Sequence, residues 1–130
     1  MDNFTKTVLY TGEDGRARWR EETIPLGEGS PAARLSQVLA ARGYQLRRSP
    51  VGFRSDWHCT PQPQWVFILE GEMEIGLPDG SARVFRAGQH FYSADTLPSG
   101  AAFCPGVHGH RSAQRGTQPL VTLFLKDSVD

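Results

Sequence analysis

Polar residues with the spacing of a metal-binding strand occur near the middle of the chain. In "DWHCTPQPQWVFILEGE" (56–72), His58 is followed two residues later by Thr60 and six residues later by Gln64. Imidazole nitrogen is a common ligand for transition metals, whereas amide oxygen is a weak ligand and threonine seldom serves as one. A buried histidine without a metal needs a hydrogen-bond partner, because burial of an unpaired polar group is costly. The residues alone therefore leave open a metal ligand and a satisfied core histidine.

Two more histidines follow in "VHGHRS". His108 and His110 form an H-x-H pair, and in an extended strand both side chains point to the same face. Together with His58 and Gln64 they would form a four-ligand or open site for Fe(II), Ni, Zn or Mn, with water completing the coordination. The alternative is that His108 lies in solvent at the tip of a loop.

An aspartate ends the segment "HFYSAD", and it has two candidate roles. Asp95 can cap its own turn by accepting a hydrogen bond from the amide of Leu97 or a neighbour. It can instead act as a general base or as the partner that orients His110. His90, which begins the same segment, is expected on the surface.

The elements that must position these residues read as strands. The turn sequences "TGEDG" and "PDGS" separate β-prone segments and predict two hairpins. The nearly continuous apolar run 64–69 predicts a strand covered on both faces, and 120–125 predicts a final strand of the same kind. The face of the first strand that carries Trp65 and Phe67 needs cover from the N-terminal strands or from a second subunit. We expect a homodimer.

One segment departs from the strand pattern. In "SPAARLSQVLAARG" (30–43), Ser30 is a candidate N-cap, Pro31 suits a first helical turn, the apolar residues recur at helical spacing and Gly43 is a stop signal. This periodicity by itself predicts a short helix.

Composition narrows the class of protein. Lys and Arg together number 14 and balance 14 Asp and Glu, so the basic footprint of a nucleic-acid-binding protein is missing. No apolar stretch approaches the roughly 18 residues of a membrane span, and the N-terminus lacks the pattern of a signal peptide. Cys59 and Cys104 form neither a C-x-x-C motif nor a disulfide framework. We expect a cytoplasmic protein that contacts neither nucleic acid nor membrane, and the scattered arginines mark no phosphate or carboxylate site.

The arrangement H-x-T-x3-Q-x6-G, which begins at His58 and ends at Gly71, resembles the first motif of the cupin superfamily, H-x-H-x3-E-x6-G. The stretches "PDGSARVFRAGQ", "HFYSADT" and "GHRS" are also similar to a branch of small single-domain bacterial cupins, most of which have no assigned function. The second motif departs from the family pattern, since Ala94 stands at a proline position and "TLPSGAAFCPGVHG" resembles an insertion.

The resemblance implies one cupin domain over 1–130, with N-terminal strands and connections in 1–50 and both motifs in a core at 51–130. The implied fold is all-β: a double-stranded β-helix, or jelly-roll barrel, in which both motifs line one mouth. It also implies an extended chain at 35–41, so the domain would hold at most one short helix.

Metal-binding cupins use two histidines and a glutamate from the first motif and one histidine from the second. By resemblance, His58 keeps the first position, Thr60 and Gln64 occupy the exchanged positions, and His110 is the histidine of the second motif. The implied cofactor is a divalent transition metal (Fe, Ni, Mn or Zn), with no organic cofactor. The two exchanged side chains are weak ligands, so the affinity for metal should fall steeply.

Two functions agree with these residues, and in both of them a small molecule binds in the mouth of the barrel. The first is a metal-assisted enzyme of dioxygenase, isomerase or lyase type, in which His58, His110 and His108 hold the metal, Gln64 tunes or positions it, and Asp95 moves a proton. The second is a metal-free, non-catalytic cupin that binds a ligand between His58, Gln64 and His110 as a sensor or carrier. Fold alone does not choose between them.

Overall fold

The computed structural model describes residues 2–128, and over this range the chain forms strands and no helix. No helix with the length and apolarity needed to cross a membrane occurs in these residues. The predicted all-β class is confirmed. The strands are, in chain order, β1 (Asn3–Thr11), β2 (Ala17–Pro25), β3 (Glu28–Ser30), β4 (Ala33–Leu35), β5 (Ala41–Ser49), β6 (Gln64–Glu70), β7 (Glu72–Gly76), β8 (Ala82–Arg86), β9 (His90–Ala94), β10 (Arg111–Arg115) and β11 (Leu120–Asp127).

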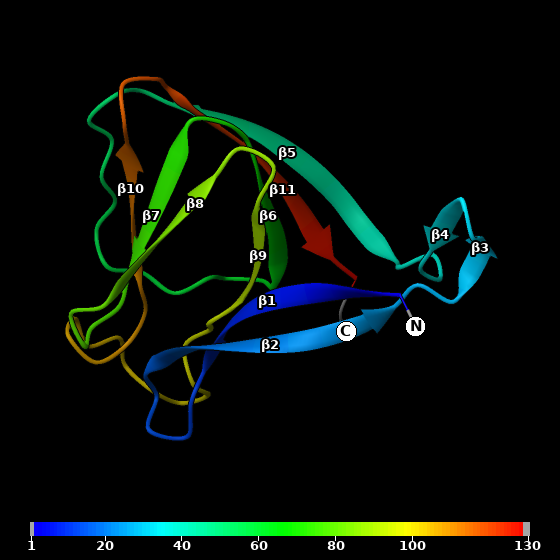
Figure 1. The fold of residues 1–130 in the computed structure, drawn as a ribbon. Helices are drawn as coiled ribbons and strands as arrows, with labels where there is room; N and C mark the ends of the chain where they lie inside the picture. The colour runs from blue at the N-terminus through cyan, green and yellow to red at the C-terminus, as the bar shows by residue number, and fades with distance from the viewer. Residues whose placement is uncertain (1, 129–130) are drawn as a thin grey trace.

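Two sheets face each other and enclose the core (Figure 1). The larger sheet has the order β2-β1-β9-β6-β11-β5, and the smaller has the order β10-β7-β8. Two isolated bridges, Arg54 with Ala113 and His58 with His110, place the segment 54–58 beside β10. The smaller sheet therefore gains a fourth, irregular member along this segment.

The order of pairing identifies the fold. From β5 onward the chain behaves as one long antiparallel ribbon: β5 pairs with β11, the segment 54–58 with β10, β6 with β9, and β7 with β8. The ribbon is rolled up, so that β11 also pairs with β6 and β10 with β7. Two four-membered layers joined in this order form a jelly roll. The jelly-roll barrel with added N-terminal strands is confirmed.

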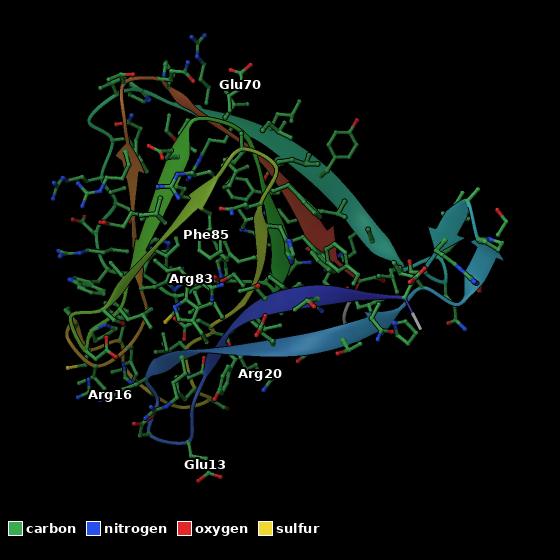
Figure 2. The ribbon with its side chains drawn as sticks, in the orientation of Figure 1. Glu13, Arg16, Arg20, Glu70, Arg83 and Phe85 are labelled. Carbon is green, nitrogen blue, oxygen red and sulfur yellow. The ribbon has the colours of Figure 1, made fainter. Side chains whose placement is uncertain are left out.

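Both predicted hairpins are present. β1 and β2 pair in register around the "TGEDG" turn, with Glu13 at its tip (Figure 2), and β1 then adds in parallel to β9. β7 and β8 pair around "PDGS". The glycines of these turns, Gly15 and Gly80, have φ of 80° and 89°, a conformation that favours glycine over other residues.

The core lies between the sheets and follows the period of two that strands impose. Val66 and Ile68 of β6 point inward and are 2% and 1% exposed. They pack with apolar residues from both sheets, and Phe85 of β8 (Figure 2) is among them. The remaining members are Leu9, Ala17, Met73, Ile75, Leu77, Phe91 and Leu120.

The outer face of β6 is only partly covered. Trp65 and Phe67 are half-buried and stack on each other at 5.5 Å, and Phe4 of β1 lies 6.3 Å from the Trp65 ring. Leu69, on the same face, remains 47% exposed. The N-terminal strand thus supplies part of the predicted cover, and the prediction of burial on both faces is wrong for Leu69.

The helix predicted by periodicity for 30–43 is wrong, and the chain there is not helical, in line with the cupin resemblance. β3 and β4 form a small hairpin that projects from the barrel, followed by an irregular segment and β5 (Figure 1). The apolar residues Leu35, Val38 and Leu39 are 57%, 98% and 54% exposed. An amphipathic helix draws most of its stability from packing its apolar face, and this segment has no core to pack against.

Candidate functional site

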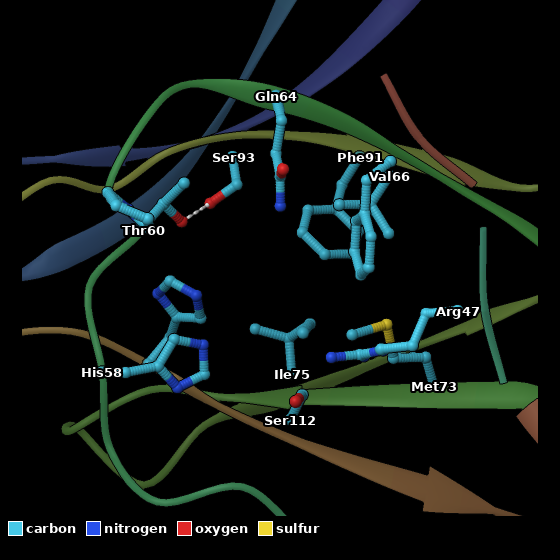
Figure 3. Close-up of a pocket in the computed structure, with 13 residues that line it drawn as sticks. Arg47, His58, Thr60, Gln64, Val66, Met73, Ile75, Phe91, Ser93 and Ser112 are labelled. Carbon is cyan, nitrogen blue, oxygen red and sulfur yellow. Dashed lines mark hydrogen bonds between the residues drawn. The ribbon is translucent and has the colours of Figure 1, made fainter. Parts of the chain in front are cut away.

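A cavity of about 90 Å³ lies between the two sheets, at the end of the barrel where the residues of the first and second cupin-like motifs meet (Figure 3). Histidines and hydroxyl groups line one side of it, and apolar side chains line the other. The lining residues are Arg47, His58, Thr60, Pro61, Gln64, Val66, Met73, Ile75, Phe91, Ser93, His110, Ser112 and Phe124.

His58 and His110 pair with each other in an isolated antiparallel β-bridge. The backbone amide of each donates to the carbonyl of the other at 2.9 Å, and the ring centroids are 4.7 Å apart. Gly109 makes this approach feasible: its φ is +82°, and a Cβ there would lie 2.5 Å from the carbonyl oxygen of His58. Only glycine fits this conformation and this spacing without strain.

His110 is held by a buried carboxylate. Its Nδ1 lies 2.8 Å from Oδ2 of Asp95, which is fully buried, and Thr11 donates to the other oxygen, Oδ1, at 2.8 Å. The carboxylate fixes the ring orientation and leaves Nε2 as the available nitrogen. The capping role predicted from the turn is wrong, because the Thr11 hydroxyl, and not Asp95, accepts from the amide of Thr96.

His58 lies at the cavity mouth and is exposed, so the interpretation as a satisfied core histidine is wrong. Its Nδ1 lies 2.8 Å from the carbonyl oxygen of Asp56. A carbonyl only accepts, so Nδ1 carries the proton and Nε2 keeps a lone pair in the neutral ring. Loss of solvent around the ring lowers the pKa of His58, and the nearby His110 and Arg47 lower it further. His58 is therefore neutral at pH 7.

The side chains at the two exchanged ligand positions, Thr60 and Gln64, already form hydrogen bonds within the protein. Thr60 is buried, and its hydroxyl bonds that of Ser93. The amide oxygen of Gln64 accepts from the ammonium of Lys126. Both oxygens therefore already take part in a hydrogen bond within the protein.

His108 lies apart from this cavity. It sits in the turn before β10, its Nδ1 accepts from the amide of Cys104 at 3.0 Å, and its ring approaches Gly15. The prediction that His108 and His110 share one face is wrong, because the positive φ of Gly109 breaks the extended backbone on which it depended.

A divalent transition metal does not fit these donors. Two imidazoles face the cavity, the Gln64 oxygen already accepts from an ammonium, and the guanidinium of Arg47 adds positive charge to the cavity lining. Within 2–128 no group of three or more His, Cys, Asp or Glu side chains is placed to hold a metal. Transition-metal sites normally need three or four such ligands. The expected set of His58, Gln64, His108 and His110 is not brought together.

Arg47 is the site residue that the sequence reasoning missed. It pairs with Thr122 across β5 and β11, so its side chain enters the barrel, where it packs on the Phe124 ring at 4.8 Å. Burial lowers its pKa. The signal was present in "QLRRS", where alternation within a strand places Arg47 and the buried Ser49 on one face, but this segment was not recognised as a strand.

His90 and the cysteines lie outside the cavity lining. His90 is half-buried on the outer face of the larger sheet, and its Nε2 accepts from the amide of Thr7 at 3.3 Å. Burial lowers its pKa. Cys59 and Cys104 carry free thiols.

Both halves of the motif thus meet at one mouth of a jelly roll, His58 and Thr60 from the first and His110 from the second. The chain has a cupin-like fold. No known family model matches the chain, and no curated protein sequence matches it.

Solved structures resemble this cupin-like chain at low identity. The cupin domain of Schizosaccharomyces pombe Cnp3 is 13% identical, with a TM-score of 0.47 over 99% of this chain and 86% of that one. Protein NMB1881 from Neisseria meningitidis is 18% identical, with a TM-score of 0.45 over 71% of this chain and 81% of that one. These likenesses concern the fold alone.

Proposed function

We propose that this cupin-like barrel binds a small organic molecule in its cavity without a metal. The observation that carries the proposal is the pair of imidazoles 4.7 Å apart, His110 fixed by buried Asp95 and His58 held in one tautomer by a carbonyl. Preorganised polar groups beside apolar side chains in one cavity are the usual mark of a ligand site. The hydroxyls of Thr60 and Ser93 are hydrogen-bonded to each other and form part of the cavity wall.

The same pair is suited to proton transfer. Neutral His58 offers the lone pair of Nε2 as a base, and His110 lies within reach of the same ligand. The enzyme interpretation of the sequence therefore narrows to a metal-free isomerase or lyase, and Asp95 acts as a positioning residue that holds His110. Binding comes first in either case.

Ligand-observed NMR on untagged protein tests the binding proposal. The panel contains acetamide, glycolamide, lactamide, 1,2-propanediol, acetate, glycolate and lactate, all smaller than seven heavy atoms. We expect at least one compound to bind wild type and to be lost in Ile75→Phe, which fills the cavity floor (Figure 3). His58→Trp, at an exposed mouth position, is a second blocking variant that spares the core. A wild type that binds none of these compounds contradicts the proposal.

We also propose that the chain forms a homodimer. The arm formed by β3, β4 and 36–40 projects from its own barrel, and Val38 on it is 98% exposed (Figure 1). An apolar groove of about 270 Å³ opens between the arm and the barrel, lined by Leu39 and Ala40 of the arm and by barrel residues that include Trp65 and Phe67. In a two-fold dimer each arm can cover the groove region of the second copy, which buries both apolar surfaces.

A further inference from the structure

Two of the three guanidinium nitrogens of Arg47 are buried without a hydrogen-bond partner. Its Nε and Nη2 are enclosed and make no hydrogen bond, and in 2–128 the Oγ1 of Thr122 is the one other buried side-chain nitrogen or oxygen in this state. Arg47 and Thr122 are direct cross-strand neighbours that face the barrel interior. Unsatisfied buried polar groups are few in folded proteins, and each calls for an explanation.

The unpartnered atoms have the geometry of a binding fork. Nε and Nη2 lie on one edge of the planar guanidinium, and their two N–H bonds run nearly parallel. That edge fits the two oxygens of a carboxylate, which accept side by side. The rings of Phe124 and Phe53, at 4.8 and 5.2 Å, pack against the guanidinium and hold it in place.

The charge of Arg47 is also uncompensated within the cavity. The lining residues include no aspartate or glutamate. Asp95, the one buried acidic residue within 2–128, already has one oxygen bonded to Thr11 and the other to His110. A guanidinium stays charged at neutral pH, so an anionic ligand would supply both the missing acceptors and the missing charge.

The opposite wall indicates the second group of the ligand. Arg47 enters the cavity from the side across from His58 (Figure 3). The lone pair on Nε2 of His58 accepts a proton donor such as a hydroxyl. The cavity of about 90 Å³ is smaller than the roughly 150 Å³ that accepts benzene, which limits the enclosed part of the ligand to two or three carbons.

We propose that the cavity binds a short 2-hydroxy carboxylate, with its carboxylate on the guanidinium of Arg47 and its hydroxyl donating to His58. This assignment rests on the proposed function of the cavity and adds the class of ligand. The same fork argues against inorganic phosphate, whose further oxygens would find no donors on the apolar wall formed by Val66 and Met73.

Paired ligands and paired variants test the assignment. Calorimetry compares glycolate and lactate with glycolamide and lactamide, their neutral counterparts, and with inorganic phosphate. We expect the two acids to bind wild type at least tenfold more tightly than the amides. Arg47→Gln should weaken the acids at least tenfold. Arg48→Gln, on the next and exposed residue of β5, makes the same change in net charge and should leave binding within twofold.

The outcomes separate this inference from the proposed function. Amides that bind as tightly as the acids, or equal losses in Arg47→Gln and Arg48→Gln, overturn the carboxylate assignment and leave cavity binding intact. Phosphate that binds more tightly than glycolate also overturns it. A wild type that binds neither the acids, nor the amides, nor the remaining compounds of the NMR panel overturns the proposed function. Thermal melting checks that each variant is folded, and Arg47→Gln should be folded because it removes a buried, unpaired charge.

Discussion

The carboxylate of Asp95 lies 2.8 Å from Nδ1 of His110, and the two side chains are 0% and 5% exposed. We expect Asp95→Asn to lower the free energy of unfolding by about 1.5–3 kcal/mol, the usual worth of a hydrogen bond to a charged group. Urea denaturation measures this loss, and nitrogen NMR of the His110 ring reports a change in its tautomer. Asp56→Asn, at an exposed residue that contributes only its backbone carbonyl, should cost less than about 0.5 kcal/mol. Equal losses in the two variants would contradict a positioning role for Asp95.

The lowered pKa of His58 makes stability depend on pH. The unfolded state, with a histidine pKa near 6.5, binds protons before the folded state does. The free energy of unfolding should therefore be highest above about pH 6.5 and fall as the pH drops below it. Urea denaturation at pH 7.5 and 5.5 measures the slope. His58→Gln should reduce it, and His90→Gln should reduce it as well, because burial also lowers the pKa of His90.

A slope unchanged in His58→Gln would contradict the assignment of a neutral imidazole with a lowered pKa. His110, Arg47 and Asp95 are the charged or titratable groups that act on this ring. His108→Gln, in the turn outside the cavity, serves as the matched variant for loss of an imidazole.

The close approach at Gly109 has its own test. Gly109→Ala and Gly106→Ala both place a side chain at positive φ, +82° and +86°. At Gly106 nothing lies within 4 Å of the added Cβ, so the loss should be the roughly 1–2 kcal/mol of a left-handed conformation. At Gly109 the Cβ would meet the carbonyl of His58 at 2.5 Å, so the loss should be larger and the binding of cavity ligands should weaken. Equal losses would show that the bridge tolerates a side chain.

Metal analysis of untagged protein tests the absence of a resident metal. We expect less than about a tenth of an equivalent, and no rise in melting temperature on adding Fe(II), Ni(II), Mn(II) or Zn(II). The variant that combines Thr60→His with Gln64→Glu restores the cupin ligand types and should gain metal binding. A stoichiometric metal in wild type that is lost in His110→Ala would contradict the metal-free proposal.

The homodimer is tested by light scattering. We expect wild type to have twice the mass of the chain, and the combined variant Leu35→Asp and Val38→Asp to be a monomer, because charge on the arm opposes burial. Val51→Asp, at a residue 56% exposed and away from the arm, is the control and should leave the dimer intact. A monomeric wild type would contradict the homodimer proposal, because the groove beside Trp65 would then stay open to solvent.

Local chemistry determined a large share of this fold from the sequence alone. The turn residues of "TGEDG" and "PDGS" select hairpins, and the alternation in β7 requires one buried face. The spacing from His58 to Gly71 resembled a cupin motif, and the structure places this motif at the mouth of a jelly roll. Such features depend on neighbours in the chain, which is why a pattern can reveal them.

Tertiary structure alone decided the chemistry of the site. The helix predicted for 30–43 does not form, because its apolar residues have no core to pack against. The side chains of His108 and His110 do not share a face, because the positive φ of Gly109 turns the backbone between them. Asp95 meets His110, and Arg47 enters the cavity, only because strands distant in sequence pair in the rolled ribbon. Whether a buried polar group finds a partner depends on residues brought from elsewhere in the chain, so the unpartnered Arg47 could be recognised only in the folded molecule.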